Sequence, residues 1–177
     1  AMIGHGYLGE KPVNISTYGD LVAFLNGLNH MWVEACKRLS PAQIVSLLRQ
    51  SGEEYCQLMA SLDPNKDALF AVAWAGEEVS KNWFHIAREY TEKWHHQQQI
   101  RLAIDQQEVL LQQRYYWPFL ETSMRALPHQ YRATMGDMGQ TISIQILGGE
   151  DRVWFLKYEN GWNLSKKATS NKRDCSI

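Results

Sequence analysis

A carboxylate and an imidazole stand four residues apart in the middle of the chain, at Glu92 and His96. The residues around them, from about 80 to 104, predict a helix, and this spacing places both side chains on one helical face. A carboxylate oxygen and an imidazole nitrogen can bind one divalent metal ion together. One further histidine would complete a 2-His-1-carboxylate site with open coordination positions, which suits catalysis rather than a purely structural role.

The stripe that contains this pair also has simpler interpretations. Polar and ionisable side chains follow one another at helical spacings along the same face, at His85, Glu89, Glu92, His96 and Gln99. They lie opposite the aromatic face of the helix, so periodicity alone favours the solvent-exposed side of an amphipathic helix. A metal site and a structural hydrogen-bond network are the alternatives. His95 points about 100° away from His96, so His96 is the natural companion of Glu92.

Other residues that could do chemistry give weaker signals. Four arginines could bind an acidic substrate, although arginines more often form surface or interhelical ion pairs: Arg88, Arg101, Arg125 and Arg132. Three widely separated cysteines argue against both a disulfide framework and a zinc knuckle. The sequence contains no glycine-rich nucleotide loop, serine nucleophile elbow or CxxC motif. The pair on the central helix is therefore the main chemical candidate.

Composition limits the class of protein. The chain has 177 residues, of which 45% are hydrophobic, enough for one domain or for one domain and a small second one. The net charge of −1 argues against nucleic acid as the main partner, because phosphate binding needs a basic surface. No apolar run reaches the roughly 18 residues of a membrane span, and no segment has signal-peptide order. We expect a cytoplasmic protein that binds neither nucleic acid nor membrane.

Two helices are predicted before the central one. An apolar stripe over residues 21–39 indicates the first helix, which Ser16 or Thr17 can cap. The second begins after Ser40, which is followed by a proline at the first helical position and a glutamine at the third. It ends before Pro64. Each helix carries an apolar face that we expect to be buried.

The central helix is expected over residues 80–104, with Ser80 as its N-cap, and a fourth helix over residues 107–126. Pro118 lies inside the fourth helix and should kink or divide it.

Strand patterns begin after residue 128. Strict alternation over residues 141–146 predicts a half-buried strand, and two more are expected at 153–158 and 162–164, with turns at 148–151 and 159–161. The tail is polar. Helices followed by a small antiparallel sheet indicate a mainly α, α+β fold.

Several of these segments resemble one known family. They are residues 20–26, 32–33, 39–41, 74–78, 82–101 and 125–128. Together they resemble the maleylpyruvate isomerase N-terminal-like branch of the DinB superfamily, from about residue 6 to about residue 167. The long central segment makes the likeness fairly specific.

The resemblance implies an up-down DinB-like helical bundle over residues 1–127, followed by a partial, sterol-carrier-like α+β domain over residues 128–177. It also implies a divalent metal, Zn, Ni or Fe, held by His, Glu and His, with Glu92 and His96 at the Glu-x-x-x-His positions. The family's other histidine lies on an earlier helix, before this sequence begins, and relatives continue beyond its end. We therefore expect a bundle without its first helix and a shortened second domain.

Relatives of this kind include isomerases and S-transferases that use a low-molecular-weight thiol such as mycothiol or bacillithiol. The resemblance thus implies a metal- and thiol-dependent reaction on a small electrophile, with Glu89 or His85 orienting the metal ligands. The alternative is an inactive, metal-free homologue that acts as an oligomeric or small-ligand-binding module. A bundle that lacks one helix exposes an apolar groove, so we expect a homodimer.

Overall fold

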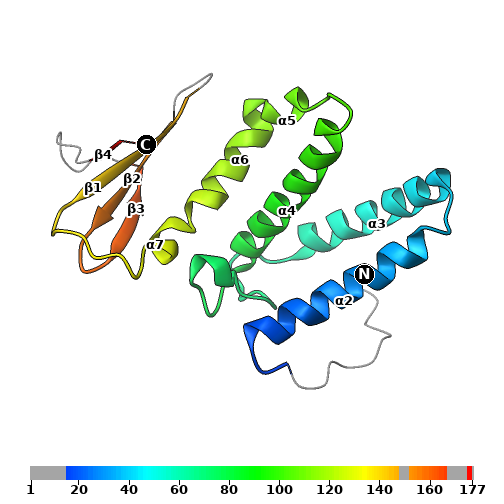
Figure 1. Cartoon of the computed structure of the whole chain (residues 1–177), viewed down its shortest axis with the longest axis horizontal. Coiled ribbons are helices and arrows are strands. Elements are labelled where there is room, and N and C mark those ends of the chain that lie inside the picture. The colour runs from blue at the N-terminus through cyan, green and yellow to red at the C-terminus, as the bar shows by residue number, and fades with distance from the viewer. Residues whose placement is uncertain (1–14, 148–151, 167–174, 177) are drawn as a thin grey trace. The chain divides into compact units, whose positions relative to one another are not determined.

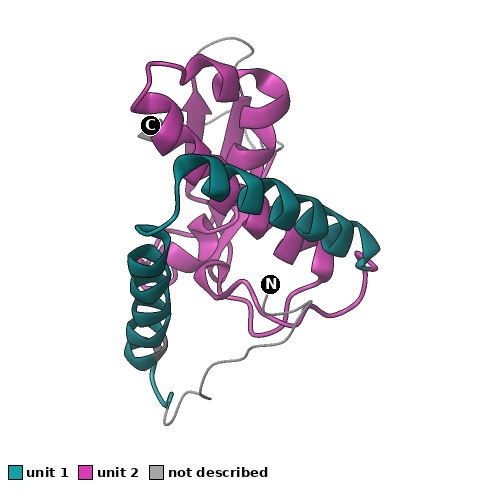
Figure 2. Ribbon diagram, turned by 90° about the vertical axis from the view of Figure 1, so that its right-hand side faces the viewer, with its two compact units in different colours: residues 1–62 teal, residues 63–177 magenta. Residues whose placement is uncertain are grey.

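A computed structural model describes residues 15–147, 152–166 and 175–176. The described part is mainly helical with a small sheet, which confirms the α+β class (Figure 1). It falls into two compact units, Ala1–Leu62 and Asp63–Ile177 (Figure 2). The helices expected to form a DinB-like bundle are shared between these units, so that bundle stays a prediction.

The first unit consists of helices α2 (Tyr18–Cys36) and α3 (Pro41–Ser61). Each begins with a capping box, as the sequence predicted for α3. The Thr17 hydroxyl accepts from the Asp20 amide, and the Asp20 carboxylate accepts from the Thr17 amide at 2.8 Å. Ser40 and Gln43 form the same reciprocal pair at the start of α3. These bonds satisfy amides that a helix start otherwise leaves without partners.

The apolar faces of these helices are not covered as predicted. Helix α3 has no buried residue, and Leu47 and Leu48 are 54% and 65% exposed. On α2 the Trp32 side chain is 70% exposed. The apolar stripe identified which side of each helix would favour burial, but it could not supply the surface that would cover it. The burial expected for these faces is therefore not formed within the single described chain.

Helix α4 (Asn82–Leu102) is the longest element of the second unit and is preceded by a short 3-10 helix, η1 (Ala73–Ala75). Lys81, rather than Ser80, stands at the N-cap of α4. Ser80 is buried; its hydroxyl accepts from the Val72 amide at 2.8 Å and donates to the Glu77 carboxylate. The predicted Ser80 cap is wrong because that hydroxyl is used to hold the preceding loop.

The predicted fourth helix is two helices, α5 (Glu108–Leu111) and α6 (Gln113–Met124), followed by the short α7 (Leu127–Gln130). The break falls at Gln112, whose backbone is extended with ψ 138, and not at Pro118. Pro118 lies inside α6, where it removes one backbone donor without ending the helix.

The sheet contains β1 (Thr141–Ile146), β2 (Arg152–Tyr158), β3 (Trp162–Ser165) and β4 (Cys175–Ser176), in the order β3-β2-β1-β4. The first three strands pair antiparallel, as predicted. Strand β4 pairs parallel with β1 and was not predicted, because two residues in a polar tail carry no strand pattern. Asn160 and Gly161 make the second turn with positive φ angles of 56° and 136°. The turn predicted at residues 148–151 lies outside the described residues.

The second unit has its core where α6 packs on the sheet. Trp117 and Leu120 of α6 contact Trp154 of β2, which is 1% exposed. Because this cluster joins helix and sheet, the compact unit runs across residue 127, where the sequence placed a domain boundary. The described residues contain no helix with the length and apolarity to cross a bilayer.

Candidate functional site

Glu92 and His96 lie one turn apart on α4, on the same face, as their spacing predicted. The Glu92 Oε2 and His96 Nε2 atoms are 4.0 Å apart, and the two side chains are 60% and 73% exposed. Two ligands of one zinc ion stand roughly 3.4 Å apart when each bond is about 2.1 Å long. A small rotation of either exposed side chain would reach that separation, so the donor pair fits a divalent ion.

The orientation of the His96 ring also fits a metal ligand. Its Nδ1 atom lies 3.2 Å from the amide oxygen of Gln99, which can only accept, so Nδ1 donates to it. Nε2 faces the Glu92 carboxylate. In the neutral ring with its proton on Nδ1, Nε2 carries a lone pair, and it and the carboxylate oxygen can bind one cation together. Histidines that bind metals are commonly oriented by a carbonyl or carboxylate partner in this manner.

A complete metal centre is not formed by the described residues alone. Among them, no group of three or more His, Cys, Asp or Glu side chains is arranged to hold an ion. Glu92 and His96 therefore offer two ligands, and further positions would be filled from outside this set. Their role as metal ligands stays a prediction.

The remaining members of the ionisable stripe have a different environment. His85 is only 4% exposed, which contradicts a uniformly solvated face. Its Nδ1 lies 2.6 Å from Nη2 of Arg88, and that nitrogen also contacts Glu89 Oε1 at 3.0 Å. Arg88 donates further to the Ala71 carbonyl at 3.2 Å. Arg88 thus stabilises the helix start instead of offering its charge to a substrate.

The burial of His85 changes its ionisation. Burial is the largest cause that lowers the pKa of His85, and the positive charge of Arg88 lowers it further, while Glu89 opposes both. Since an arginine can only donate, Nδ1 of His85 accepts, and the ring is held as a neutral acceptor. His85 therefore has a structural partner on its own helix, one that the spacing of the stripe did not reveal.

The other predicted arginines lie in separate places. Arg132 donates to the His129 carbonyl at 2.7 Å. Arg101 lines a pocket of about 340 Å³ between α4 and the residues around α5. Tyr90 lines the same pocket, and burial raises the pKa of its hydroxyl, which donates to the Tyr115 carbonyl at 2.8 Å.

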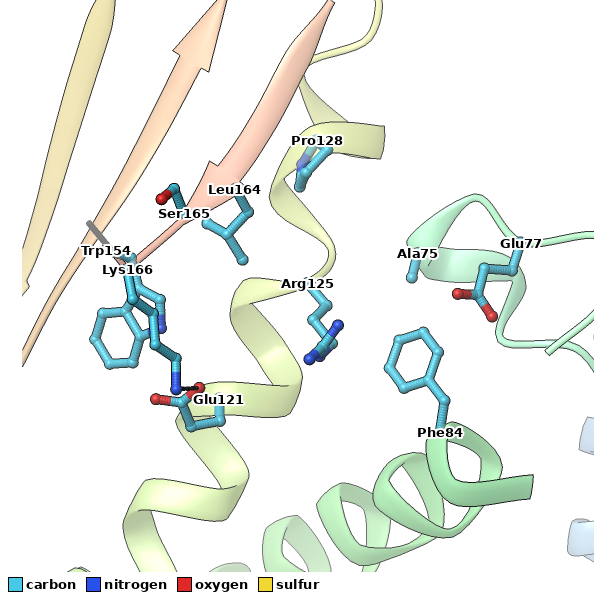
Figure 3. A pocket seen from close by; sticks show the side chains of 10 residues that line it. All are labelled: Ala75, Glu77, Phe84, Glu121, Arg125, Pro128, Trp154, Leu164, Ser165 and Lys166. Carbon is cyan, nitrogen blue, oxygen red and sulfur yellow. Dashed lines mark ion pairs between the residues drawn. The ribbon is translucent and has the colours of Figure 1, made fainter. Parts of the chain in front are cut away.

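Arg125 lines a second pocket, of about 270 Å³, that sequence reasoning did not predict. Figure 3 shows Arg125 reaching from α6 into the space between the start of α4 and strand β3. Its walls are Ala75, Glu77, Phe84, Glu121, Arg125, Pro128, Trp154, Leu164, Ser165 and Lys166. We call it the Arg125 pocket. Only the fold brings these segments together, since they are spread over some ninety residues of sequence. Five of the lining residues lie in segments of the family resemblance, but apart from the arginine none was singled out as a candidate for binding.

Comparison with known proteins adds no relative. No protein-family model matches the chain, and no curated protein or solved structure matches it significantly. The resemblance to the DinB-like family therefore rests on the sequence segments alone.

Proposed function

We propose that this protein is a divalent-metal-dependent isomerase or S-transferase of the DinB-like, maleylpyruvate isomerase-like type, acting on a small electrophile with a low-molecular-weight thiol. Glu92 and His96 would hold the metal. The observation that carries this proposal is the arrangement of His96, whose Nε2 faces Glu92 while Nδ1 faces the Gln99 amide oxygen. This is the donor arrangement of an imidazole prepared for a cation.

The chain's own residues have distinct tasks in this proposal. Glu92 contributes a negative charge that offsets part of the charge of a divalent ion, and Gln99 fixes the orientation of the His96 ring. Both ligands are exposed, which leaves space for a thiol and an electrophile. A bound metal would favour the thiolate form of the thiol, which is the nucleophile. The third protein ligand would come from outside the described residues or from another copy.

Metal content tests the proposal directly. Purified protein without a histidine tag, loaded with Zn²⁺ and desalted, should retain about one ion per site, and Glu92→Gln and His96→Gln should each lose it. His95→Gln is the matched control, because the neighbouring His95 ring packs edge-on against Phe119 and away from Glu92. Equal metal content in all four proteins would refute the metal assignment. Thiol-dependent turnover of a small electrophile then tests the reaction class.

We also propose that the protein forms a homodimer. The support is the exposure of large apolar side chains on the first unit, where Trp32, Leu47 and Leu48 are all more than half exposed. Apolar patches on a surface usually mark an interaction site. Sedimentation equilibrium at micromolar concentration should give twice the chain mass, and Leu47→Gln with Leu48→Gln should reduce it. A wild-type monomer would overturn this part of the proposal.

A cytoplasmic location is proposed for the same protein. Cys36 and Cys56 are free thiols, a state that a reducing compartment maintains, and a reducing compartment also maintains a small thiol cofactor. Subcellular fractionation tests this location.

The second candidate is a metal-free module that binds a small ligand, and the Arg125 pocket favours it. Metal content separates the two functions: a protein that retains no Zn²⁺ but binds a small molecule would be such a module.

A further inference from the structure

We propose that the Arg125 pocket binds a small organic monocarboxylate. The pocket lies within the second unit, where the first turn of α4, the end of α6 and strand β3 face one another (Figure 3). Phe84 and Glu92 are eight residues apart on α4, which is about 12 Å along a helix. The pocket is therefore separate from the proposed metal ligands, and its occupation does not depend on a metal.

The Arg125 guanidinium is positioned by two aromatic rings. Its Cζ atom lies 4.8 Å from the ring centroid of Trp83 and 5.7 Å from that of Phe84. A cation over a ring is attracted to the ring's face. A ring contact of this kind takes up none of the guanidinium's hydrogen-bond donors, so its N–H groups can still donate to a ligand.

No carboxylate in the described ranges lies within ion-pair distance of Arg125. The contrast with Arg88 is informative, because Arg88 is engaged by His85, Glu89 and a carbonyl. Arg125 is instead an exposed cation in the wall of the pocket. A carboxylate is the group whose two oxygens match the paired donors of a guanidinium.

The size of the pocket limits the ligand. Phe84, Trp154 and Leu164 form the apolar part of its wall, but Phe84 and Trp154 are only 2% and 1% exposed over the whole residue and offer a ligand little contact surface. A volume of about 270 Å³ accommodates a small ring or a short branched chain but not a large cofactor, which would need a cavity toward the upper end of the range known for ligand sites. The cation and the volume together favour a small acid.

One carboxylate in the pocket wall, that of Glu77, limits the charge of the ligand to one. The other, Glu121, is paired with Lys166 at 2.6 Å and with Arg152 at 3.4 Å, which offset its charge. Glu77 accepts a hydrogen bond from the buried Ser80 hydroxyl, and its carboxylate repels a second anionic group on the ligand. We therefore expect the pocket to reject diphosphates and nucleotides.

Isothermal titration of the full-length protein with three probes tests the ligand class. The probes are 3-phenylpropanoate, its neutral analogue 3-phenylpropan-1-ol, and pyrophosphate. Binding of the acid should be roughly 10- to 100-fold tighter than binding of the alcohol, as expected for loss of a charge-assisted hydrogen-bond pair. Pyrophosphate should not compete. Equal affinity for acid and alcohol, no binding of the acid, or tighter binding of pyrophosphate would each overturn the proposal.

Variants then assign the site to Arg125. Arg125→Gln should weaken 3-phenylpropanoate binding roughly 10-fold or more, while Arg125→Lys keeps the charge, loses the paired donors and should give an intermediate value. Arg114→Gln is the matched control, because Arg114 also lies over an aromatic ring, 4.6 Å from the Tyr115 centroid, but does not line this pocket. Wild-type binding in Arg125→Gln would refute the assignment.

The variant series separates this inference from the proposed function. If Arg125→Gln fails to fold, as judged by circular dichroism, Arg125→Lys and the three-probe comparison on the native protein still decide the question. Zn²⁺ content should be unchanged in every Arg125 variant. Failure of acid binding with metal retained would reject the pocket proposal alone, and loss of metal binding in Glu92→Gln with acid binding retained would support the two sites as independent.

Discussion

Gly76 lies against the imidazole of His129, so closely that a Cβ atom at Gly76 would stand 2.5 Å from Nδ1 and 2.9 Å from Cγ of that ring. Gly76 ends η1 with a φ of +84°. In the same contact, Nε2 of Gln130 donates to the Trp74 carbonyl at 3.4 Å. The segments around residues 75 and 128, both of which carry the family resemblance, are thus parts of one packing contact.

This contact predicts that Gly76→Ala destabilises the protein severely. A left-handed backbone costs a non-glycine residue about 1–2 kcal/mol, and displacing the packed ring costs about 1–3 kcal/mol more. Gly139→Ala is the control, since Gly139 has a φ of +85° with nothing within 4 Å of its added Cβ, and should show only the backbone cost. Urea unfolding measures both, and equal losses would contradict the role of the His129 contact.

The stability of the second unit should depend on pH through His85. Because the folded pKa of His85 is lowered from the ordinary value of 6.5, the unfolded chain takes up the proton at a higher pH than the folded protein. The free energy of unfolding therefore falls as the pH drops below about 6.5, until the folded pKa is reached. His85→Gln removes this contribution, so its unfolding free energy should change less between pH 7.5 and pH 5.5. An identical change of unfolding free energy in the wild type and the variant would contradict the role of His85.

Truncation of Leu156, in the core of the sheet, should cause a large loss of stability. Its side chain is 0% exposed, so Leu156→Ala removes buried methyl groups and leaves a cavity, at a cost of about 2–5 kcal/mol. Leu147→Ala is the matched substitution at a residue that is 76% exposed, and should cost less than about 0.5 kcal/mol. Thermal unfolding, monitored by circular dichroism, compares the stabilities of the two variants.

The orientation of the His96 ring predicts that metal affinity also depends on Gln99, a residue that would not touch the metal. Gln99→Leu removes the acceptor for Nδ1, so the ring loses its fixed orientation and Zn²⁺ affinity should fall roughly 10- to 100-fold. Gln97→Leu is the control, since Gln97 lines the other pocket. Competition with a zinc-binding dye measures both affinities. Equal affinities would show that Gln99 does not position the ligand.

Local elements were predictable where the signal lies within a few residues. The Ser40 capping box and the strand at residues 141–146 are formed as expected, because capping bonds and alternation depend on neighbours in sequence. The Ser80 cap was wrong, and the helix is not divided at Pro118. Ser80 is taken by Val72 and Glu77, and a local rule cannot weigh such a competing partner.

The sequence alone determined that Glu92 and His96 share one helical face, because side-chain direction on a helix follows from spacing. Only the tertiary structure decided that His85, on the same stripe, is buried against Arg88, and that Arg125 stands over two rings in the wall of a pocket. Burial depends on contacts between segments far apart in the chain, and so does the meeting of Arg125, which follows α6, with residues of α4 and β3. Periodicity reports which face of an element favours burial, whereas packing decides what covers that face and which charges are left free.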